Sequence, residues 1–362
     1  MESKDPPPPA DDGSAESPPE NGDSFDEEAV LARAAEVDEA ARMVRLAGDY
    51  SHPPRQKRVL LPIVLFVATC LSTFWTGSVE WMPALHMNRF QRAGDVFLLQ
   101  WQQGMLGSAI ADAGGVLVGD WQRGLLYMAA VMGILLTHEM GHFVMAVRNR
   151  IPASLPFFIP VPILPFGTMG AVIGMQGSRA NRRQLFDLGI AGPLAGLAIA
   201  VPVTWFGILQ LNHGPQPTSG ITFYNPLIFT LLIDYLRPDF PSNTVLYMSQ
   251  FNPLLMAGWV GMLVTGLNTL PISQLDGGHV AYALLGRRRA HLLARSLIVA
   301  AIIAILCWEA YMWVLMLVLV IAIGIHHPPT ADDSVDLGWS RRSLGYASLA
   351  IPVLCFPPMR IA

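Results

Sequence analysis

The segment Leu125-Leu-Tyr-Met-Ala-Ala-Val-Met-Gly-Ile-Leu-Leu-Thr-His138-Glu139-Met-Gly-His142-Phe-Val-Met-Ala-Val147 decides the fold class. It is long enough to cross a bilayer, since a transmembrane helix needs about 20 predominantly apolar residues. Three ionisable groups within such a helix are costly and call for a functional reason. On a helix, positions i and i+4 share a face, so His138 and His142 can bind one zinc ion. Glu139 beside them can act as a proton-transferring acid/base.

Two His ligands leave a catalytic zinc site one protein ligand short. The sequence Asn268-Thr-Leu-Pro271-Ile-Ser-Gln-Leu-Asp276-Gly277-Gly278-His279 ends another apolar run and contains the candidates. Asp276 is the first candidate, because the two glycines after it permit a tight turn that directs the carboxylate inward. His279 is the alternative third ligand. Asn268 is suited to hydrogen-bond a scissile carbonyl or a developing oxyanion. The competing interpretation of these polar groups is hydrogen bonding between helices.

The composition independently indicates a polytopic membrane protein. Of 362 residues, 52% are hydrophobic and 14% charged, whereas soluble domains carry about 25% charged residues. Nucleic-acid binding is excluded, because no basic stripe with interleaved aromatic residues is present. The three cysteines lie in apolar runs and indicate no disulfide framework. We expect seven spans, at about residues 59–83, 125–147, 185–211, 254–271, 292–308, 311–325 and 344–358.

The distribution of charge predicts the orientation in the membrane. Residues 1–50 carry 14 Asp/Glu and 4 Lys/Arg, which leaves 13 of 27 acidic and 19 of 23 basic residues for the rest. If the loops 55–58, 148–184, 273–296 and 326–343 lie in the cytoplasm, that side collects 14 of those 19 basic residues. This agrees with the positive-inside rule. The N-terminus is then cytoplasmic, and residues 85–122 form an interfacial or re-entrant stretch on the far side.

The segment that follows the first motif is neither a span nor an ordinary loop. Five prolines between Ile151 and Phe166 exclude a helix, so we expect an extended chain followed by a short strand around Met169–Met175. A peptide bond must be extended to be cut, and a strand edge can receive an extended peptide by edge addition. The candidate substrate-binding residues are Gly170, Ala171, Val172, Ile173 and Gly174.

The pairing of an intramembrane His-Glu-x-x-His with a distant Asn-x-x-Pro-x-x-x-Leu-Asp-Gly-Gly resembles the site-2 protease family of intramembrane zinc metalloproteases. The segment Gly189-Ile-Ala-Gly-Pro-Leu-Ala-Gly196 looks like that family's small-residue motif. The resemblance covers about residues 120–285. The tail after His327 is similar to the branch found in bacteria, cyanobacteria and plant chloroplasts. The resemblance implies one catalytic zinc ion held by His138, His142 and Asp276, with Glu139 as acid/base and Asn268 as substrate-orienting residue.

The resemblance also implies an architecture and a function. We expect an all-α polytopic membrane protein with a three-helix catalytic core, a small membrane-associated β element and flanking helices. The expected parts are an acidic, largely disordered tail (1–54), a first span with an outer interfacial segment (55–123), the zinc protease core (124–285) and C-terminal transmembrane helices (286–362). The expected reaction is hydrolysis of a peptide bond in the transmembrane segment of a membrane-protein substrate, as in regulated intramembrane proteolysis.

The expected setting is a bacterial cytoplasmic membrane, with the lipid bilayer, a transmembrane substrate and an upstream protease as partners. The alternative function is a membrane zinc transporter or a non-catalytic metal-binding scaffold. Transporters also bury His and Asp within spans, but they rarely need a Glu base beside a ligand. They usually show repeated halves as well, and this sequence shows no internal repeat.

Overall fold

The computed structural model describes residues 59–175, 177–211, 222–240, 246–272, 274–308, 310–323 and 327–357. All of them belong to one compact unit, Arg58–Ala362. The expected disordered tail at 1–54 lies outside the described residues, as do the basic residues at 55–58. The described chain is mostly helical with two very small sheets, which confirms the expected fold class.

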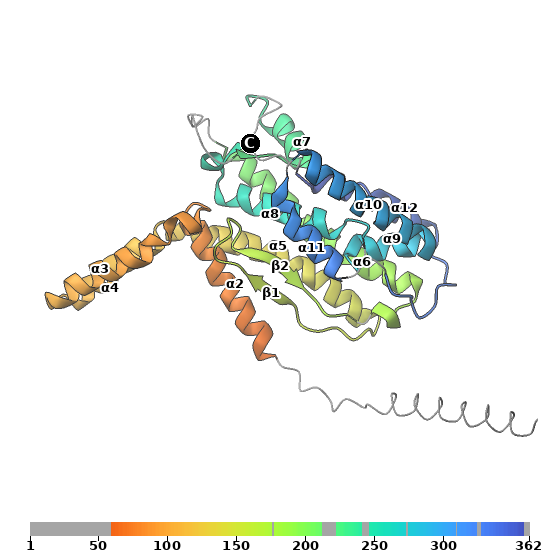
Figure 1. Ribbon diagram of the computed structural model, residues 1–362, viewed down its shortest axis with the longest axis horizontal. Coiled ribbons are helices and arrows are strands. Elements are labelled where there is room, and N and C mark those ends of the chain that lie inside the picture. Colours follow the sequence, from red (N-terminus) through yellow and green to blue (C-terminus); the bar gives the residue numbers. More distant parts are fainter. Residues whose placement is uncertain are drawn as a thin grey trace, which may run out of the picture. The chain divides into compact units, whose positions relative to one another are not determined.

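Three helices form the centre of the unit and carry the sequence motifs. α5 (Trp121–Arg148) packs against α6 (Arg182–Leu209), and both pack against α8 (Pro253–Asn268). α2 (Leu60–Ser78) packs with its last turn against the start of α5, and Figure 1 shows the two helices diverging from there. The core between these helices is apolar and includes Tyr127, Leu135 and Met256. Burial of such side chains at about 25 cal/mol per Å² of apolar surface holds the helices together where they face one another rather than lipid.

The starts of these helices follow from local capping chemistry. The Asp120 side chain accepts a hydrogen bond from the backbone N–H of Arg123 and caps α5. Asn181 and Gln184 form a reciprocal capping box at the start of α6. Asn252 caps α8, whose first residue is Pro253, the position where a missing N–H costs no hydrogen bond.

Among the described residues, four helices are long and apolar enough to cross a membrane. They are α2, α5, α6 and α10 (Arg287–Trp308), and they match four of the seven expected spans. The expected span at 254–271 corresponds to α8, which has 16 residues. At about 1.5 Å per residue α8 is roughly 24 Å long, shorter than the roughly 30 Å hydrocarbon core.

The last two expected spans differ from the structure. The described part of 311–325 holds a short 3₁₀ turn (η4, Tyr311–Trp313) followed by the ten-residue helix α11 (Val314–Ile323). The single span expected at 344–358 is wrong, because the chain there forms two separate helices, α12 (Trp339–Ser348) and α13 (Ile351–Cys355). The physical reason is Pro352, which lacks an N–H and cannot continue the helix from Ser348.

The proline-rich segment is extended, as expected, and forms a hairpin beside α2 and α5. β1 (Phe157–Pro160) pairs antiparallel with β2 (Thr168–Val172). The expected strand at 169–175 therefore ends earlier, and Ile173 and Gly174 lie beyond it. An isolated bridge between Ala153 and Met175 continues the pairing.

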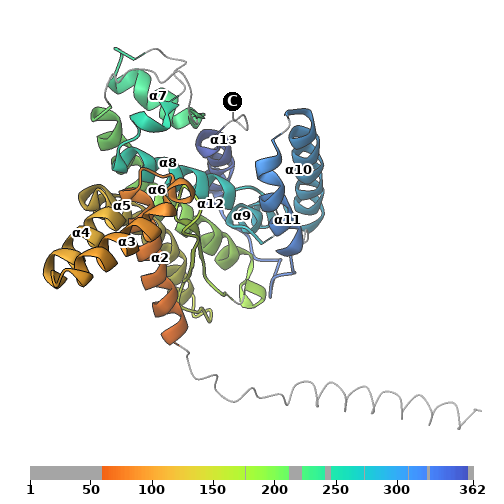
Figure 2. The ribbon, with the colours of Figure 1, turned by 60° about the vertical axis from the view of Figure 1, so that its left-hand side comes forward.

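The remaining elements flank this core, and several were not expected. The interfacial stretch is a pair of adjacent helices, α3 (Asn88–Gln102) and α4 (Leu106–Val118), which lie side by side in Figure 1 and in Figure 2. The segment after Pro271, expected as a loop, begins a helix, α9 (Asp276–Leu285). The other elements are α7 (Leu227–Leu236), the strand pair β3 (Thr222–Phe223) and β4 (Leu246–Tyr247), and the 3₁₀ turns η1 (Pro83–His86), η2 (Gly177–Arg179) and η3 (Met248–Gln250).

Candidate metal centre

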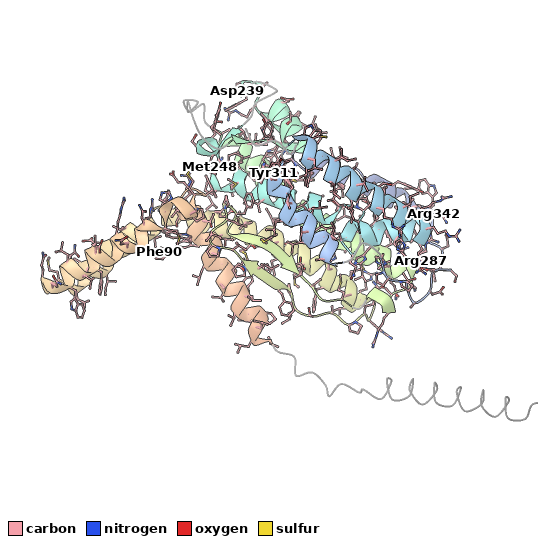
Figure 3. The ribbon with its side chains drawn as sticks, viewed as in Figure 1. Phe90, Asp239, Met248, Arg287, Tyr311 and Arg342 are labelled. Carbon is pink, nitrogen blue, oxygen red and sulfur yellow. The ribbon has the colours of Figure 1, made fainter. Side chains whose placement is uncertain are left out.

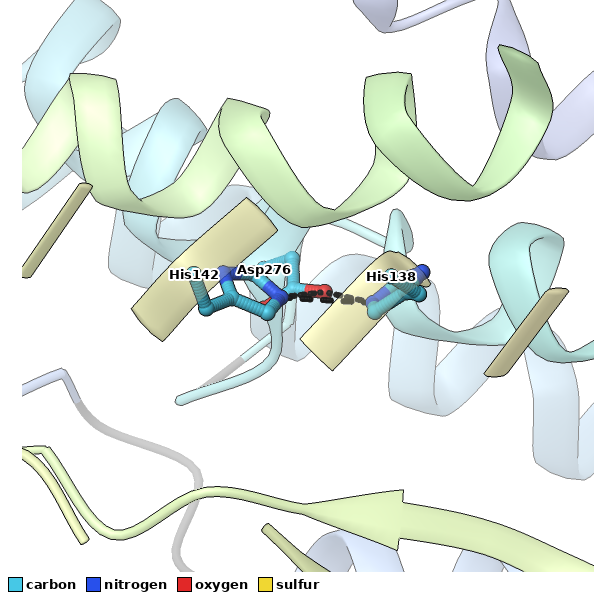
Figure 4. Close-up of side chains that lie close together, drawn as sticks. All are labelled: His138, His142 and Asp276. Atoms are coloured by element: carbon cyan, nitrogen blue, oxygen red, sulfur yellow. Dashed lines mark hydrogen bonds and ion pairs between the residues drawn. The ribbon is translucent and has the colours of Figure 1, made fainter. Parts of the chain in front are cut away.

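Three side chains from two distant segments converge at the middle of the helical core. The Nε2 atoms of His138 and His142, on α5, lie 3.3 Å apart. Each of them lies 3.2 Å from Oδ2 of Asp276, the first residue of α9. Figure 4 shows the three side chains meeting at one point. Within the described residues, this is the group of His, Cys, Asp and Glu side chains found with metal-binding spacing.

The ligand spacing fits a tetrahedral metal ion. With bonds of about 2.0–2.2 Å to nitrogen and oxygen, tetrahedral zinc places its ligand atoms about 3.3–3.5 Å apart. The three observed separations, 3.2, 3.2 and 3.3 Å, are close to that value. The site is also well shielded, since His138 and His142 are each 2% exposed. The residues present therefore fit a zinc ion.

A hydrogen bond at the other ring nitrogen of His142 suits its role as a metal ligand. Its Nδ1–H donates a hydrogen bond of 2.9 Å to the backbone carbonyl of Leu188 on α6. In a neutral imidazole, Nε2 then carries a lone pair, which faces the Asp276 carboxylate. A metal cation bound at Nε2 would also meet Oδ2 of Asp276, which lies 3.2 Å from this nitrogen. The hydrogen bond to Leu188 thus prepares Nε2 as a metal ligand and fixes the ring orientation.

The turn between α8 and α9 positions Asp276. α8 ends at Asn268, three residues before Pro271, and α9 begins at Asp276 itself. The turn is tightly packed: a Cβ at Gly277 would lie 1.9 Å from the carbonyl oxygen of Thr269. A side chain cannot occupy that space, so the glycine after Asp276 is required for close approach of the two helices. The expected inward turn at Asp276 is present.

Small residues on α6 make room for the two imidazoles. A Cβ at Gly192 would lie 2.0 Å from Nε2 of His142, and one at Gly196 would lie 3.0 Å from Nδ1 of His138. Gly189 similarly contacts the backbone of Asp276 and the Cβ of His279. Because these positions are three and four residues apart, they share one face of α6. The small-residue motif thus lets α6 pack directly on the metal site.

Glu139 and Asn268 both lie at this site. Glu139 is 4% exposed, and its Oε2 has no hydrogen-bond partner among the described residues. A buried carboxylate oxygen without a partner is costly and is available to a water molecule. Nδ2 of Asn268 lies 3.4 Å from Nε2 of His138, so the amide borders the same space.

His279, the alternative third ligand, is directed elsewhere. Its Nδ1 lies 2.6 Å from Nε2 of His327, a residue of the segment that follows α11. His327 in turn packs against Tyr282, with ring centroids 4.5 Å apart and the rings tilted by 35°. His279 therefore anchors α9 to the C-terminal segment and is not in the group of converging ligand atoms.

The expected substrate strand lies beside the centre without touching the metal ligands. Gly170 of β2 faces Val264 of α8, and a Cβ at Gly170 would lie 3.8 Å from Cγ1 of Val264. Val264 is one turn before Asn268 on the same helix. Met169 and Val172 are exposed, while Thr168 is buried. β2 is thus a strand next to α5 and α8 with its second edge unpaired at Gly170–Val172 within the described chain.

A model of peptidase family M50 matches residues 126–308, about half of the chain, and this match includes every residue of the converging group. The chain belongs to peptidase family M50. Peptidase family M50 is the site-2 protease family that the sequence motifs resemble. The protein is therefore a member of a family of zinc metalloproteases. Together with the four long apolar helices, membership identifies an integral, multi-pass membrane protein.

The curated relatives that this chain matches are also named as zinc metalloproteases. The chain is 29% identical to "Probable zinc metalloprotease EGY1, chloroplastic" of Arabidopsis thaliana over 234 residues, which is 63% of this chain and 42% of the relative. The protein of that name from Oryza sativa subsp. japonica is 29% identical over 239 residues, 63% of this chain and 40% of the relative. "Probable zinc metalloprotease EGY2, chloroplastic" of Arabidopsis thaliana is 29% identical over 201 residues, 53% of this chain and 34% of the relative.

This M50 chain spans about two fifths of the length of the first curated relatives it matches. No solved structure matches it. The M50 motifs themselves were visible in the sequence, but two supporting groups were not. The group that orients His142 is the backbone carbonyl of Leu188, and the identity of a side chain does not reveal what its backbone carbonyl binds. The pairing of His279 with His327 joins residues 48 positions apart, which spacing alone does not reveal.

Proposed function

We propose that this M50 peptidase hydrolyses a peptide bond within the transmembrane segment of a membrane-protein substrate, with one catalytic zinc ion. The observation that carries the proposal is Glu139. Its buried Oε2 has no partner among the described residues, and it belongs to the residue beside the first of three converging metal-ligand side chains. A purely structural polar cluster would be expected to satisfy that oxygen.

His138, His142 and Asp276 would hold the zinc ion. When bound, zinc supplies Lewis acidity that polarises the scissile carbonyl and makes a water molecule a stronger nucleophile. Glu139 accepts the proton of the attacking water and returns it to the leaving amine. The Asn268 amide donates a hydrogen bond to the substrate carbonyl oxygen, where negative charge develops. The 4% exposure of Glu139 keeps bulk water away from this exchange.

The substrate needs an extended backbone at the cut. We assign its binding to the hairpin beside α5 and α8, with Gly170, Ala171 and Val172 of β2 forming the edge and Ile173 and Gly174 continuing it. Edge addition uses backbone hydrogen bonds, which tolerate varied side chains. This suits a protease that acts on apolar transmembrane sequences of low side-chain diversity.

The membrane orientation follows from the basic loops. His142 lies six residues before Arg148, where α5 ends, so the metal site is about 9 Å from that end of the helix. Arg287 and Arg342 of the loops expected in the cytoplasm lie toward one end of the molecule in Figure 3, and Met248 and Asp239 lie toward the other. We therefore propose entry of water, cleavage and product release on the cytoplasmic side.

The cellular setting is part of the proposal. The relatives' names place those proteins in chloroplasts, so the comparisons do not support a bacterial cytoplasmic membrane, and that assignment remains a prediction. An upstream protease that shortens the substrate first remains a prediction as well, as does the division into a tail (1–54), an outer segment (55–123), a core (124–285) and C-terminal helices (286–362).

The experiment replaces Glu139 with Gln in cells and compares their membrane proteomes with those of wild-type cells by mass spectrometry. Single-pass membrane proteins, or membrane-anchored fragments of them, should accumulate in the E139Q cells and disappear on complementation. If the two proteomes are the same and E139Q instead changes cellular zinc content, the transporter alternative would replace the protease.

A further inference from the structure

A polar cavity of about 500 Å³ lies where α5 ends and α6 begins, and its lining includes none of the three metal-ligand residues. It is lined by the last turn of α5, the first turns of α6 and the segment that leads into α12. The lining residues are Met145, Arg148, Asn149, Asn181, Arg183, Gln184, Asp187, Val335 and Arg341. Its volume lies within the range of about 300–1,000 Å³ that is usual for small-ligand sites.

Most side-chain acceptor atoms that line this cavity already accept hydrogen bonds from other groups of the protein. Both carboxylate oxygens of Asp187 accept hydrogen bonds from Arg341, at 2.7 and 3.0 Å. The amide oxygens of Asn181 and Gln184 accept backbone N–H groups in the capping box of α6. Among the described residues, the amide oxygen of Asn149 accepts no hydrogen bond, while its Nδ2 donates to the backbone carbonyl of Met145. A ligand that needs hydrogen-bond acceptors on the protein would find few here.

The donor groups, in contrast, are largely unused. Within the described part of the chain, Arg148 makes no hydrogen bond and no ion pair. Arg183 donates from Nε and Nη2 to the backbone carbonyl of Asp336, and its Nη1 has no partner among the described residues. The side-chain N–H groups of Asn181 and Gln184 also point to no partner there. Three guanidinium groups against one carboxylate give the lining a net charge of about +2.

A donor-rich, cationic cavity selects an anionic ligand rich in acceptors, and phosphate matches that chemistry. The position of the cavity relative to the membrane indicates which molecule supplies this phosphate. α5 ends at Arg148 and α6 begins at Arg182, and both helices are candidate membrane spans. The cavity therefore lies where the spans meet water, at the depth of lipid headgroups. Basic pockets between transmembrane helices at this depth bind the headgroups of anionic lipids.

We propose that this cavity binds the phosphate headgroup of an anionic phospholipid, with Arg148 and Arg183 as the principal donors. Binding would join the last turn of α5 to the first turn of α6. Met145 in the lining is only three residues from His142, so the lipid would stabilise the two helices that carry His138, His142 and the Leu188 carbonyl. The proposal does not depend on the proteolytic activity.

The test measures the melting temperature of the purified, delipidated full chain in detergent as phosphatidylglycerol is added. A ligand that binds only the folded state raises this temperature by mass action. Phosphatidylglycerol should stabilise the wild type, and phosphatidylcholine and inorganic phosphate should not at the same concentration. The double variant R148Q/R183Q should need at least about tenfold more phosphatidylglycerol for the same shift, since each arginine near a lipid surface contributes appreciably.

Two further variants make the result decisive. R288Q/R289Q removes the same charge from exposed residues of α10 and should behave as wild type. Q184E keeps the capping box, because Glu suits that position as well as Gln, but it places a carboxylate in the cavity and should weaken the lipid effect without loss of folding. The proposal is overturned if Q184E and R288Q/R289Q respond alike, or if phosphatidylcholine or inorganic phosphate stabilises the wild type equally.

Discussion

At the residue scale, the metal site depends on its ligands and equally on the absence of a side chain at Gly192. His142 receives its orientation from a backbone carbonyl, and its ring lies directly against the Cα of Gly192. A real Cβ atom almost never approaches another heavy atom closer than 3.0 Å, yet a Cβ at Gly192 would lie 2.0 Å from Nε2 of His142. Any side chain at this position must displace the imidazole or separate α5 from α6.

The first prediction follows from that contact. G192A should lower the zinc content of the purified protein well below one ion per chain, measured by elemental mass spectrometry, because the His142 ring can no longer reach the shared ligand position. The matched control is G133A on α5, where nothing lies within 4 Å of the added Cβ. Full zinc content in G192A would show that the imidazole does not bind the metal from this position.

The second prediction concerns Asn268. If its amide donates to the developing oxyanion, N268A should lower kcat by about 10²–10³-fold while zinc content stays at the wild-type level. The measurement is the rate of cleavage of a transmembrane peptide in detergent, together with zinc analysis of the same sample. Loss of zinc in parallel with activity would instead assign Asn268 to holding His138, which its Nδ2 approaches at 3.4 Å.

At the element scale, the sequence predicted features that depend on local chemistry, but it did not predict helix α9 or the break between α12 and α13. The α5 motif, the break after α8 and the extended proline-rich segment each follow from the residues within one element. Helix α9 was not predicted, because its first turn holds Asp276 and two glycines, which form helices poorly. Tertiary contacts with Thr269 and with α6 stabilise this turn. The prediction of a seventh span was wrong, because hydropathy alone does not indicate the helix break before Pro352.

The third prediction tests β2 as the substrate-binding edge. A171P and V172P each remove one backbone N–H, and successive residues of a strand direct these groups to opposite edges. One of the two substitutions should therefore abolish a hydrogen bond to the substrate and lower cleavage strongly, with zinc content unchanged. The conservative changes A171S and V172T keep the N–H groups and should keep activity. Equal cleavage by all four variants would place the substrate elsewhere.

At the scale of the whole molecule, the direction of product release depends on which side of the membrane each end of the bundle faces. The charge distribution predicts this orientation. Two exposed positions, Arg288 and Ser340, belong to loops expected in the cytoplasm, and two others, Gln103 and Ser249, to segments expected on the far side. All four are solvent-exposed, so single cysteines there should not disturb packing.

The fourth prediction uses those positions in a chain without Cys70, Cys307 and Cys355. Cysteines at 288 and 340 should react with a membrane-impermeant thiol reagent in inside-out vesicles and be protected in intact cells. Cysteines at 103 and 249 should show the opposite pattern. Reversal of both pairs would place the metal centre near the outer face and invert the direction in which a cleavage product is released.

The most direct test of the central claim combines zinc content and peptide cleavage in one preparation of the purified full chain and its E139Q variant. Glu139 is not among the converging ligand atoms, so E139Q should keep about one zinc ion per chain. Because it has lost the group that accepts the proton of the attacking water, its cleavage of a transmembrane peptide should fall by at least about 10²-fold. Cleavage by E139Q at the wild-type rate, with zinc retained, would contradict the role of Glu139 as the catalytic acid/base.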